Sequence, residues 1–195
     1  CNARVTAVND EMLAMMKKAG CWMISYGIES GSPQMLKKMM KGATKKQALK
    51  ALKLTRKNGI TSKGFFMVGI PGETVETVRE TLDFIKVLPL DEISINFFTP
   101  FPGSQLYDEV LKEGFKPDFE HMNMQKVVYV PKSISRNDLE ASMDKVIYKF
   151  YLRPSKIGLN LYRAMKDYYE FLRTLRMGKI FLKLLLSTFK KRMNI

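Results

Sequence analysis

The stretch Gly64-Phe65-Phe66-Met67-Val68-Gly69-Ile70-Pro71-Gly72-Glu73-Thr74 decides the fold of this chain. It begins as an apolar run typical of a buried strand, breaks at glycines and passes directly into a helix. A second junction of the same kind is Ile24-Ser25-Tyr26-Gly27-Ile28-Glu29-Ser30-Gly31. Because ligands of parallel α/β folds bind at the carboxyl ends of the strands, both junctions are candidate binding sites.

On either side of these junctions, short apolar runs alternate with longer stretches of helical period, which is the pattern of βα units and a parallel sheet. The expected strands are residues 2–5, 23–27, 64–70 and 92–98. We therefore predict an α/β fold with right-handed crossovers, as part of a doubly wound sheet or of a barrel. No GxGxxG or Walker-type loop follows the first strand, so a plain nucleotide-binding fold loses its main support.

Capping residues divide the intervening sequence into helices. The first helix follows Asn9 or Asp10 and ends at Gly20, and the second begins near Ser32-Pro33. A further helix starts at Thr44 and the last one starts at Thr74. The apolar residues of these last two helices that are predicted to face the sheet are Ala48, Leu49, Leu52 and Leu54, and Val78, Leu82, Ile85 and Leu88.

Five short strings follow one another along the chain and together carry a family resemblance. They are Gly27-Ile28-Glu29-Ser30-Gly31, Met40-Lys41-Gly42, Gly59-Ile60, Gly69-Ile70-Pro71-Gly72-Glu73-Thr74 and Thr99-Pro100-Phe101-Pro102-Gly103-Ser104. In this order and spacing they resemble the second half of the core of a radical S-adenosylmethionine (SAM) enzyme. The later string Phe150-Tyr151-Leu152-Arg153-Pro154-Ser155 resembles the branch with an N-terminal cobalamin-binding domain, such as the anaerobic magnesium-protoporphyrin ester cyclases.

The resemblance implies a partial TIM-like (β/α)6 barrel in which a CxxxCxxC loop holds a [4Fe-4S] cluster. SAM bound to that cluster is reductively cleaved to a 5′-deoxyadenosyl radical. This chain has only Cys1 and Cys21, in no such spacing, so the cluster ligands are absent and no metal ligand is assigned. We expect a fragment with family strands three to six in residues 1–130 and a basic helical extension in residues 131–195, inactive alone.

Site residues follow from the same resemblance, and none is assigned a catalytic role. Glu29 matches the position that binds the ribose hydroxyls of SAM, and Ser30 flanks it; the alternative is that Glu29 caps the next helix. Lys41 matches a basic position that meets the methionine carboxylate, against the alternative of a solvated surface lysine. Arg4, in the first strand, points into the barrel mouth or lies at the surface.

The remaining predicted contacts are with the adenine of SAM. Gly69, Ile70 and Gly72 match the glycine motif after the fifth family strand, where backbone groups and the Ile side chain pack against the adenine and glycine allows close approach. Thr99 ends the sixth strand near the adenine. Strand alternation separates Phe66 and Val68 from Phe65 and Met67, and alignment with the family favours Phe66 and Val68 as the inward pair.

Composition places further limits on the chain. Its 195 residues carry a net charge of +14, and residues 151–195 hold 11 Lys or Arg against 2 Asp or Glu. The basic segment Lys179–Arg192 is too short and too charged to span a bilayer. Three roles remain open for this segment. In decreasing order of preference they are helical packing, contact with an anionic membrane surface and nucleic-acid binding, and no nucleic-acid motif is present. Two reduced cysteines and no signal peptide favour a cytoplasmic location, with peripheral contact at the inner membrane surface as the variant.

Two functions are compatible with these features. The first is the SAM-binding part of a radical SAM enzyme that acts on an unreactive carbon of a metabolite. Its partners are SAM, a small-molecule substrate and the N-terminal half of the same protein, and an upstream domain would bring cobalamin. The second is a non-catalytic docking module that uses the basic C-terminal helices. The unpaired edge of the first strand also predicts dimerisation or aggregation of the isolated chain.

Overall fold

The computed structural model describes residues 1–166, 171–172, 175–176 and 178 of the chain. The chain divides into two compact units, Cys1–Met143 and Asp144–Ile195. The sheet and all predicted site residues lie in the first unit. The predicted boundary between residues 130 and 131 stays a prediction.

The first unit is built on a four-stranded sheet. Its strands are β1 (Asn2–Ala3), β2 (Met23–Glu29), β3 (Thr61–Val68) and β4 (Glu92–Phe97). They are all parallel and lie in the order β1-β2-β3-β4. The α/β class and the parallel sheet are therefore confirmed. β1 is shorter than expected, and β3 begins at Thr61 instead of Gly64.

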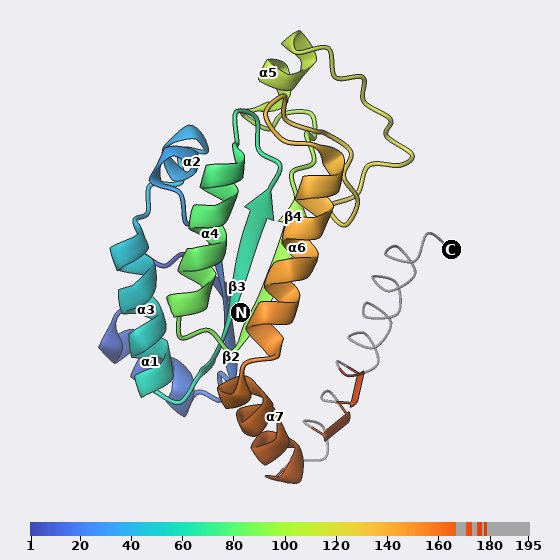
Figure 1. Ribbon diagram of the computed structural model, residues 1–195. Coiled ribbons are helices and arrows are strands. Elements are labelled where there is room, and N and C mark those ends of the chain that lie inside the picture. The colour runs from blue at the N-terminus through green and yellow to red at the C-terminus, as the bar shows by residue number, and fades with distance from the viewer. Residues whose placement is uncertain (167–170, 173–174, 177, 179–195) are drawn as a thin grey trace. The chain divides into compact units, whose positions relative to one another are not determined.

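Helices fill the crossovers where the capping residues predicted them. They are α1 (Asp10–Lys18), α2 (Pro33–Lys38), α3 (Lys45–Lys57) and α4 (Val75–Val87). A short helix that was not predicted, α5 (Tyr107–Lys112), follows β4. The side chains of Asn9, Thr44 and Thr74 accept a backbone N–H from the first turn of α1, α3 and α4. These bonds satisfy amides that would otherwise lack a partner at a helix start. Figure 1 shows α2, α3 and α4 grouped to one side of the strands.

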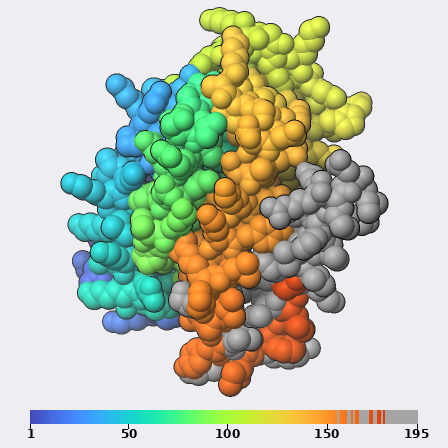
Figure 2. Space-filling model, in the orientation of Figure 1, coloured from blue at the N-terminus to red at the C-terminus, as the bar shows by residue number. Residues whose placement is uncertain are grey.

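The helical layer covers one face of the sheet, and alternation along the strands defines that face. Tyr26 of β2 is fully buried, and its hydroxyl lies 2.7 Å from the hydroxyl oxygen of Thr55 in α3. The register places Gly64 beside Tyr26 and Ile93 beside Gly64, so these residues share a face. The buried members of this helix-covered face are Ile24, Tyr26, Ile28, Ser62, Gly64, Phe66, Val68, Ile93, Ile95 and Phe97. In the space-filling view, α3 and α4 lie directly side by side over it (Figure 2).

The predicted apolar stripes of α3 and α4 are partly correct. The buried residues of α3 are Ala48, Ala51, Leu52 and Thr55, and those of α4 are Thr77, Val78, Thr81, Phe84 and Ile85. Leu49, Leu54 and Leu82 are only half-buried. The residues buried beyond those predicted are Ala51, Thr55, Thr77, Thr81 and Phe84.

A second apolar cluster closes the carboxyl ends of β3 and β4. Its buried members are Met35, Ile70, Phe98, Leu106, Val110 and Tyr129. Tyr129 packs edge-on against Phe98 and donates its hydroxyl to Glu113 at 2.6 Å. Burial raises the pKa of Tyr129, so this phenol remains a donor at neutral pH. The segment around Tyr129 is thereby fixed over the strand ends.

The last described helices are α6 (Arg136–Tyr151), which runs across the division between the units, and α7 (Pro154–Lys166). Both lie within residues 131–195, where a helical extension was predicted. Within the second unit, two cationic groups lie over the Phe150 ring. The Arg153 guanidinium is 4.9 Å and the Lys156 ammonium 5.3 Å from the ring centre. Lys179–Arg192 lies outside the described residues, and among the residues described no helix is long and apolar enough to cross a bilayer.

Candidate functional site

The carboxyl end of β2 is irregular. The pairing of β2 with β3 shifts between Gly27 and Glu29, so the strand carries a bulge there. Glu29 has φ +69°, a left-handed conformation that residues with a Cβ rarely adopt. Such strain persists only where the surroundings impose it, and it is concentrated at functional sites. The bulge turns the Glu29 side chain back over the strand.

A second left-handed residue places Lys41 next to Glu29. Helix α2 ends with the Lys41 N–H bonded to the Leu36 carbonyl and the Met40 N–H bonded to the Lys37 carbonyl. This is a Schellman end, and Met40, at φ +46°, occupies the position that glycine usually takes. The chain therefore reverses direction at Met40 and leads Lys41 back toward the sheet.

Glu29 and Lys41 form an ion pair. The Lys41 Nζ lies 2.9 Å from Glu29 Oε1, and the side chains of Lys41 and Glu29 are 25% and 21% exposed, respectively. A pair this sheltered from water attracts more strongly than one on the open surface. The structure thus brings together two predicted site residues that are twelve positions apart, and Glu29 contacts Lys41 rather than capping α2.

Gly27 makes room for this pair. A Cβ built on Gly27 would lie 2.7 Å from Glu29 Oε1 and 3.0 Å from the Lys41 Nζ. The two charged groups therefore lie directly on the backbone of β2, in the space that a side chain would fill. This places them on the sheet face opposite the helices.

Ser30 and Gly31 serve the packing of the turn. Ser30 is fully buried; its hydroxyl lies 2.9 Å from the Thr81 hydroxyl of α4 and accepts the Ser32 N–H. Since Thr81 donates its own proton to the Thr77 carbonyl, Ser30 donates to Thr81. A Cβ on Gly31 would lie 2.5 Å from Phe84. Ser30 flanks Glu29 as predicted, but its hydroxyl is engaged within the protein.

The carboxyl end of β3 is a turn held by a buried carboxylate. Gly69 and Gly72 have φ +84° and +74°, which glycine adopts without strain. Glu73 Oε2 accepts the N–H of Gly69 at 2.5 Å and the N–H of Ile70 at 3.2 Å. Ile70 is fully buried in the second apolar cluster. The three predicted residues thus form one turn.

Glu73 has no role predicted from the sequence, yet it is the most buried acid of the described residues. Its side chain is fully shielded from solvent, and its Oε1 has no hydrogen-bond partner among them. Burial raises the pKa of Glu73 to about 7, while the Gly69 and Ile70 amides lower it by a smaller amount. The available signal was the position of Glu73 four residues after Gly69, within reach of the turn's amides.

The prediction that Phe66 and Val68 are the inward pair is wrong. Both are almost fully buried on the helix-covered face. Phe65 and Met67 lie on the other face, where the register places Gly27 beside Phe65 and Ser94 next to it. This face, which we call the open face, carries half-buried and mostly polar residues: Ser25, Gly27, Lys63, Phe65, Met67, Glu92, Ser94 and Asn96. Glu29 and Lys41 lie at its carboxyl edge.

Arg4 and Thr99 occupy the carboxyl ends of the outer strands. Arg4 is exposed and follows β1 instead of lying in it, because the strand ends at Ala3 and a turn closes on the Arg4 carbonyl. Thr99 is buried and donates to the Phe97 and Asn123 carbonyls at 3.3 and 3.2 Å. Arg4 remains accessible to a ligand, whereas the Thr99 hydroxyl ties the loop after β4 to residue 123.

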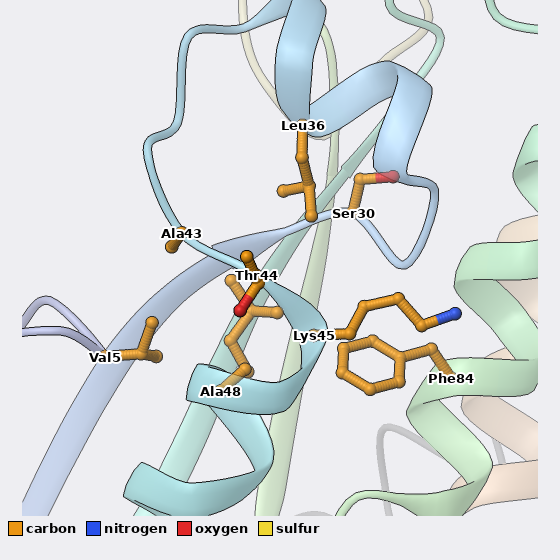
Figure 3. A pocket seen from close by; sticks show the side chains of 9 residues that line it. Val5, Ser30, Leu36, Ala43, Thr44, Lys45, Ala48 and Phe84 are labelled. Atoms are coloured by element: carbon orange, nitrogen blue, oxygen red, sulfur yellow. The ribbon is translucent and has the colours of Figure 1, made fainter.

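A small cavity lies on the helix side of the β2 end (Figure 3). Apolar side chains such as Val5, Ile28, Leu36 and Phe84 line most of it. The Lys45 side chain crosses it, with the ammonium 5.2 Å from the centre of the Phe84 ring. Ile28 and Glu29 leave β2 on opposite faces, so this cavity is separate from the Glu29–Lys41 pair.

The described residues contain no group of three or more His, Cys, Asp or Glu side chains placed to hold a metal ion. Cys1 is exposed and Cys21 is half-buried, and both are free thiols. An iron-sulfur cluster therefore does not fit the part of the chain that the structure describes.

Comparison with known proteins finds a family match over the first part of the chain. Residues 1–85 match the model of the radical SAM superfamily. The chain is 30% identical over 174 residues to an uncharacterized methyltransferase of Pyrococcus horikoshii, covering 87% of this chain and 36% of that protein. It is also 30% identical over 151 residues to the anaerobic magnesium-protoporphyrin IX monomethyl ester cyclase of Rubrivivax gelatinosus, covering 76% and 27% of the two chains.

The fold agrees with these matches. Coproporphyrinogen III oxidase from Escherichia coli, a radical SAM enzyme, superposes with a TM-score of 0.58 at 13% identity, covering 76% of this chain and 31% of that one. At this identity the likeness concerns the fold alone, and it supports the predicted barrel-like architecture. The chain spans roughly a quarter to a third of the length of the curated relatives it matches.

Proposed function

We propose that this chain is the SAM-binding part of a radical SAM enzyme, because residues 1–85 match the model of the radical SAM superfamily. The observation that carries the proposal is the Glu29–Lys41 pair at the carboxyl end of β2. It lies at the edge of a polar, half-buried sheet face, where enzymes with parallel strands bind their ligands.

Glu29 fits the ribose of SAM. Lys41 occupies its Oε1, and no bond to Oε2 is recorded among the described residues. A carboxylate oxygen accepts strongly from a hydroxyl, so Oε2 can accept from the ribose while Oε1 stays with Lys41. The left-handed backbone of Glu29 keeps this carboxylate over Gly27 instead of letting it point to solvent.

The turn at the end of β3 fits the adenine. Gly69 and Gly72 expose backbone without a Cβ, and the Glu73 carboxylate holds the Gly69 and Ile70 amides in place. The Ile70 side chain faces the apolar cluster, so the contact with adenine comes from the backbone of the turn. This part of the chain orients the nucleoside and excludes water from one side of it.

A reduced [4Fe-4S] cluster would supply the electron for reductive cleavage of SAM, and the resulting radical would remove hydrogen from an unreactive carbon. The cluster ligands would come from a CxxxCxxC segment outside these 195 residues, because the described residues do not provide them. The resemblance of residues 150–155 to the branch with a cobalamin-binding domain makes cobalamin a proposed further cofactor, held by an upstream domain. The substrate would contact the open face of the sheet.

The proposal is tested by reductive SAM cleavage in the full-length protein. The protein is reconstituted anaerobically with iron and sulfide, and formation of 5′-deoxyadenosine is measured with the wild type and Glu29→Ala. We expect product in the wild type and a loss of about tenfold to a hundredfold in the variant, since a charge-assisted hydrogen bond is removed. A full-length protein that binds no cluster would leave the docking-module function instead.

A further inference from the structure

Lys41 contacts Glu29, and this contact suggests a role different from direct ligand binding. We propose that Lys41 is a positioning residue that holds Glu29 Oε1, so that Oε2 is presented to the ribose of the bound nucleoside. This inference rests on the proposed function. It replaces the expectation that Lys41 meets the methionine carboxylate of SAM.

Three features show that the pair is built into the fold. The Schellman end of α2 directs Lys41 toward the sheet, although Met40 must adopt a left-handed conformation for it. The bulge directs Glu29 toward Lys41 at a similar cost. Gly27 leaves the space that both groups fill. A lysine meant only for a ligand carboxylate needs none of these features.

The energetics favour a lasting pair. Both side chains are about three-quarters buried, so each charge has lost much of its hydration. If Lys41 left Glu29 for another carboxylate, Glu29 would remain partly buried without its counter-ion, which is costly. Holding one oxygen of Glu29 also limits the rotamers of its side chain, so less conformational entropy is lost when a ligand binds.

The test compares two ligands that differ in the amino-acid part. S-adenosylhomocysteine carries the carboxylate, and 5′-methylthioadenosine lacks it, while both contain the same ribose. Binding to the full chain is measured by titration calorimetry for the wild type, Lys41→Met and Lys41→Arg. Lys50→Met, an exposed lysine of α3, is the matched control.

We expect Lys41→Met to lower the affinity for both ligands by the same factor, about tenfold, because Glu29 loses its orientation. Lys41→Arg should recover part of the affinity for both ligands, and Lys50→Met should change neither. In a Glu29→Gln background, Lys41→Met should have almost no further effect, since the pair is already broken.

The outcomes separate the two claims. Suppose that Lys41→Met lowers the affinity for S-adenosylhomocysteine but leaves the affinity for 5′-methylthioadenosine unchanged. Lys41 then binds the ligand carboxylate, and the positioning role is overturned while the proposed SAM site stands. If the wild type binds neither ligand, the proposed function fails and the positioning role fails with it. Gly27→Ala adds an independent arm, because it displaces the pair without removing either charge and should act like Lys41→Met.

Discussion

The carboxyl ends of β2 and β3 each carry a glutamate, but the two side chains have different surroundings. Both strands stop at a left-handed residue and place a glutamate beside the turn. At β2 the glutamate is paired with a lysine and partly open to water. At β3 it is fully buried and bonded to two backbone amides. The β2 carboxylate faces a cation and is partly exposed, whereas the β3 carboxylate shapes the backbone.

At the end of β2, the largest expected effect is a loss of stability when a side chain is added at Gly31. In Gly31→Ala, the new Cβ would lie 2.5 Å from Phe84 and 2.7 Å from the Glu80 carbonyl. We expect a loss of about 3 kcal/mol in the free energy of unfolding, at the upper end for overpacking. Chemical denaturation measures it. Gly20→Ala is the control, because Gly20 has φ +89° with no atom within 4 Å of its Cβ, and strain alone should cost about 1 kcal/mol. Equal losses would contradict the close contact with α4.

The β3 end should show a pH-dependent stability. The folded pKa of Glu73, about 7, lies above the ordinary value of 4.5, so the folded state binds the proton more tightly. The contribution of Glu73 protonation to the free energy of unfolding is complete below pH 4.5 and is lost as the pH rises through 7. The difference is on the order of 3 kcal/mol between about pH 4 and about pH 8.

Glu73→Gln tests this property, because the amide cannot ionise. Denaturation of wild type and variant at several pH values should show the variant gaining stability relative to the wild type as the pH rises from about 4 to about 8. Glu29→Gln, at the other strand end, serves as the comparison. If the difference in the free energy of unfolding between Glu73→Gln and the wild type does not change with pH, burial does not destabilise the charged form of Glu73.

A smaller effect is expected from relieving the strain at β2. Asn tolerates the left-handed region better than Glu, so Glu29→Asn should change the free energy of unfolding by less than about 1 kcal/mol, with strain relief offsetting the lost ion pair. The same variant should bind nucleosides poorly, because its amide is shorter and uncharged. Thermal unfolding and calorimetry together measure both properties. A loss of several kcal/mol would mean that Glu29 serves mainly the stability of the fold.

Much of the fold follows from local sequence signals. Asn9, Thr44 and Thr74 are recognisable as capping residues in the sequence, and the structure shows each one accepting a backbone N–H. These signals are local, because a cap and the amide that it satisfies lie three residues apart. The shortening of β1 to Asn2–Ala3 was not predictable, since a strand's length depends on the strand beside it.

The site was less predictable because it depends on contacts between distant residues. The orientation of Phe66 was predicted incorrectly, although Ser94 and Asn96 alternate with Ile93 and Ile95 and mark the polar face of the neighbouring strand. The contact between Glu29 and Lys41 requires a bulge and a Schellman end, which no spacing in the sequence reveals. The burial of Glu73 arises from the tertiary packing around the turn.

The most direct test of the SAM site is whether Glu29 recognises the ribose. Binding of 5′-methylthioadenosine and its 2′-deoxy analogue is measured with the wild type and Glu29→Ala by titration calorimetry. We expect the wild type to bind the deoxy analogue about tenfold more weakly and the variant to bind both ligands equally weakly, since the lost hydroxyl and the lost carboxylate are partners. If the wild type does not distinguish the two ligands, or if the variant retains the preference, Glu29 does not bind the ribose and the proposed SAM site is wrong.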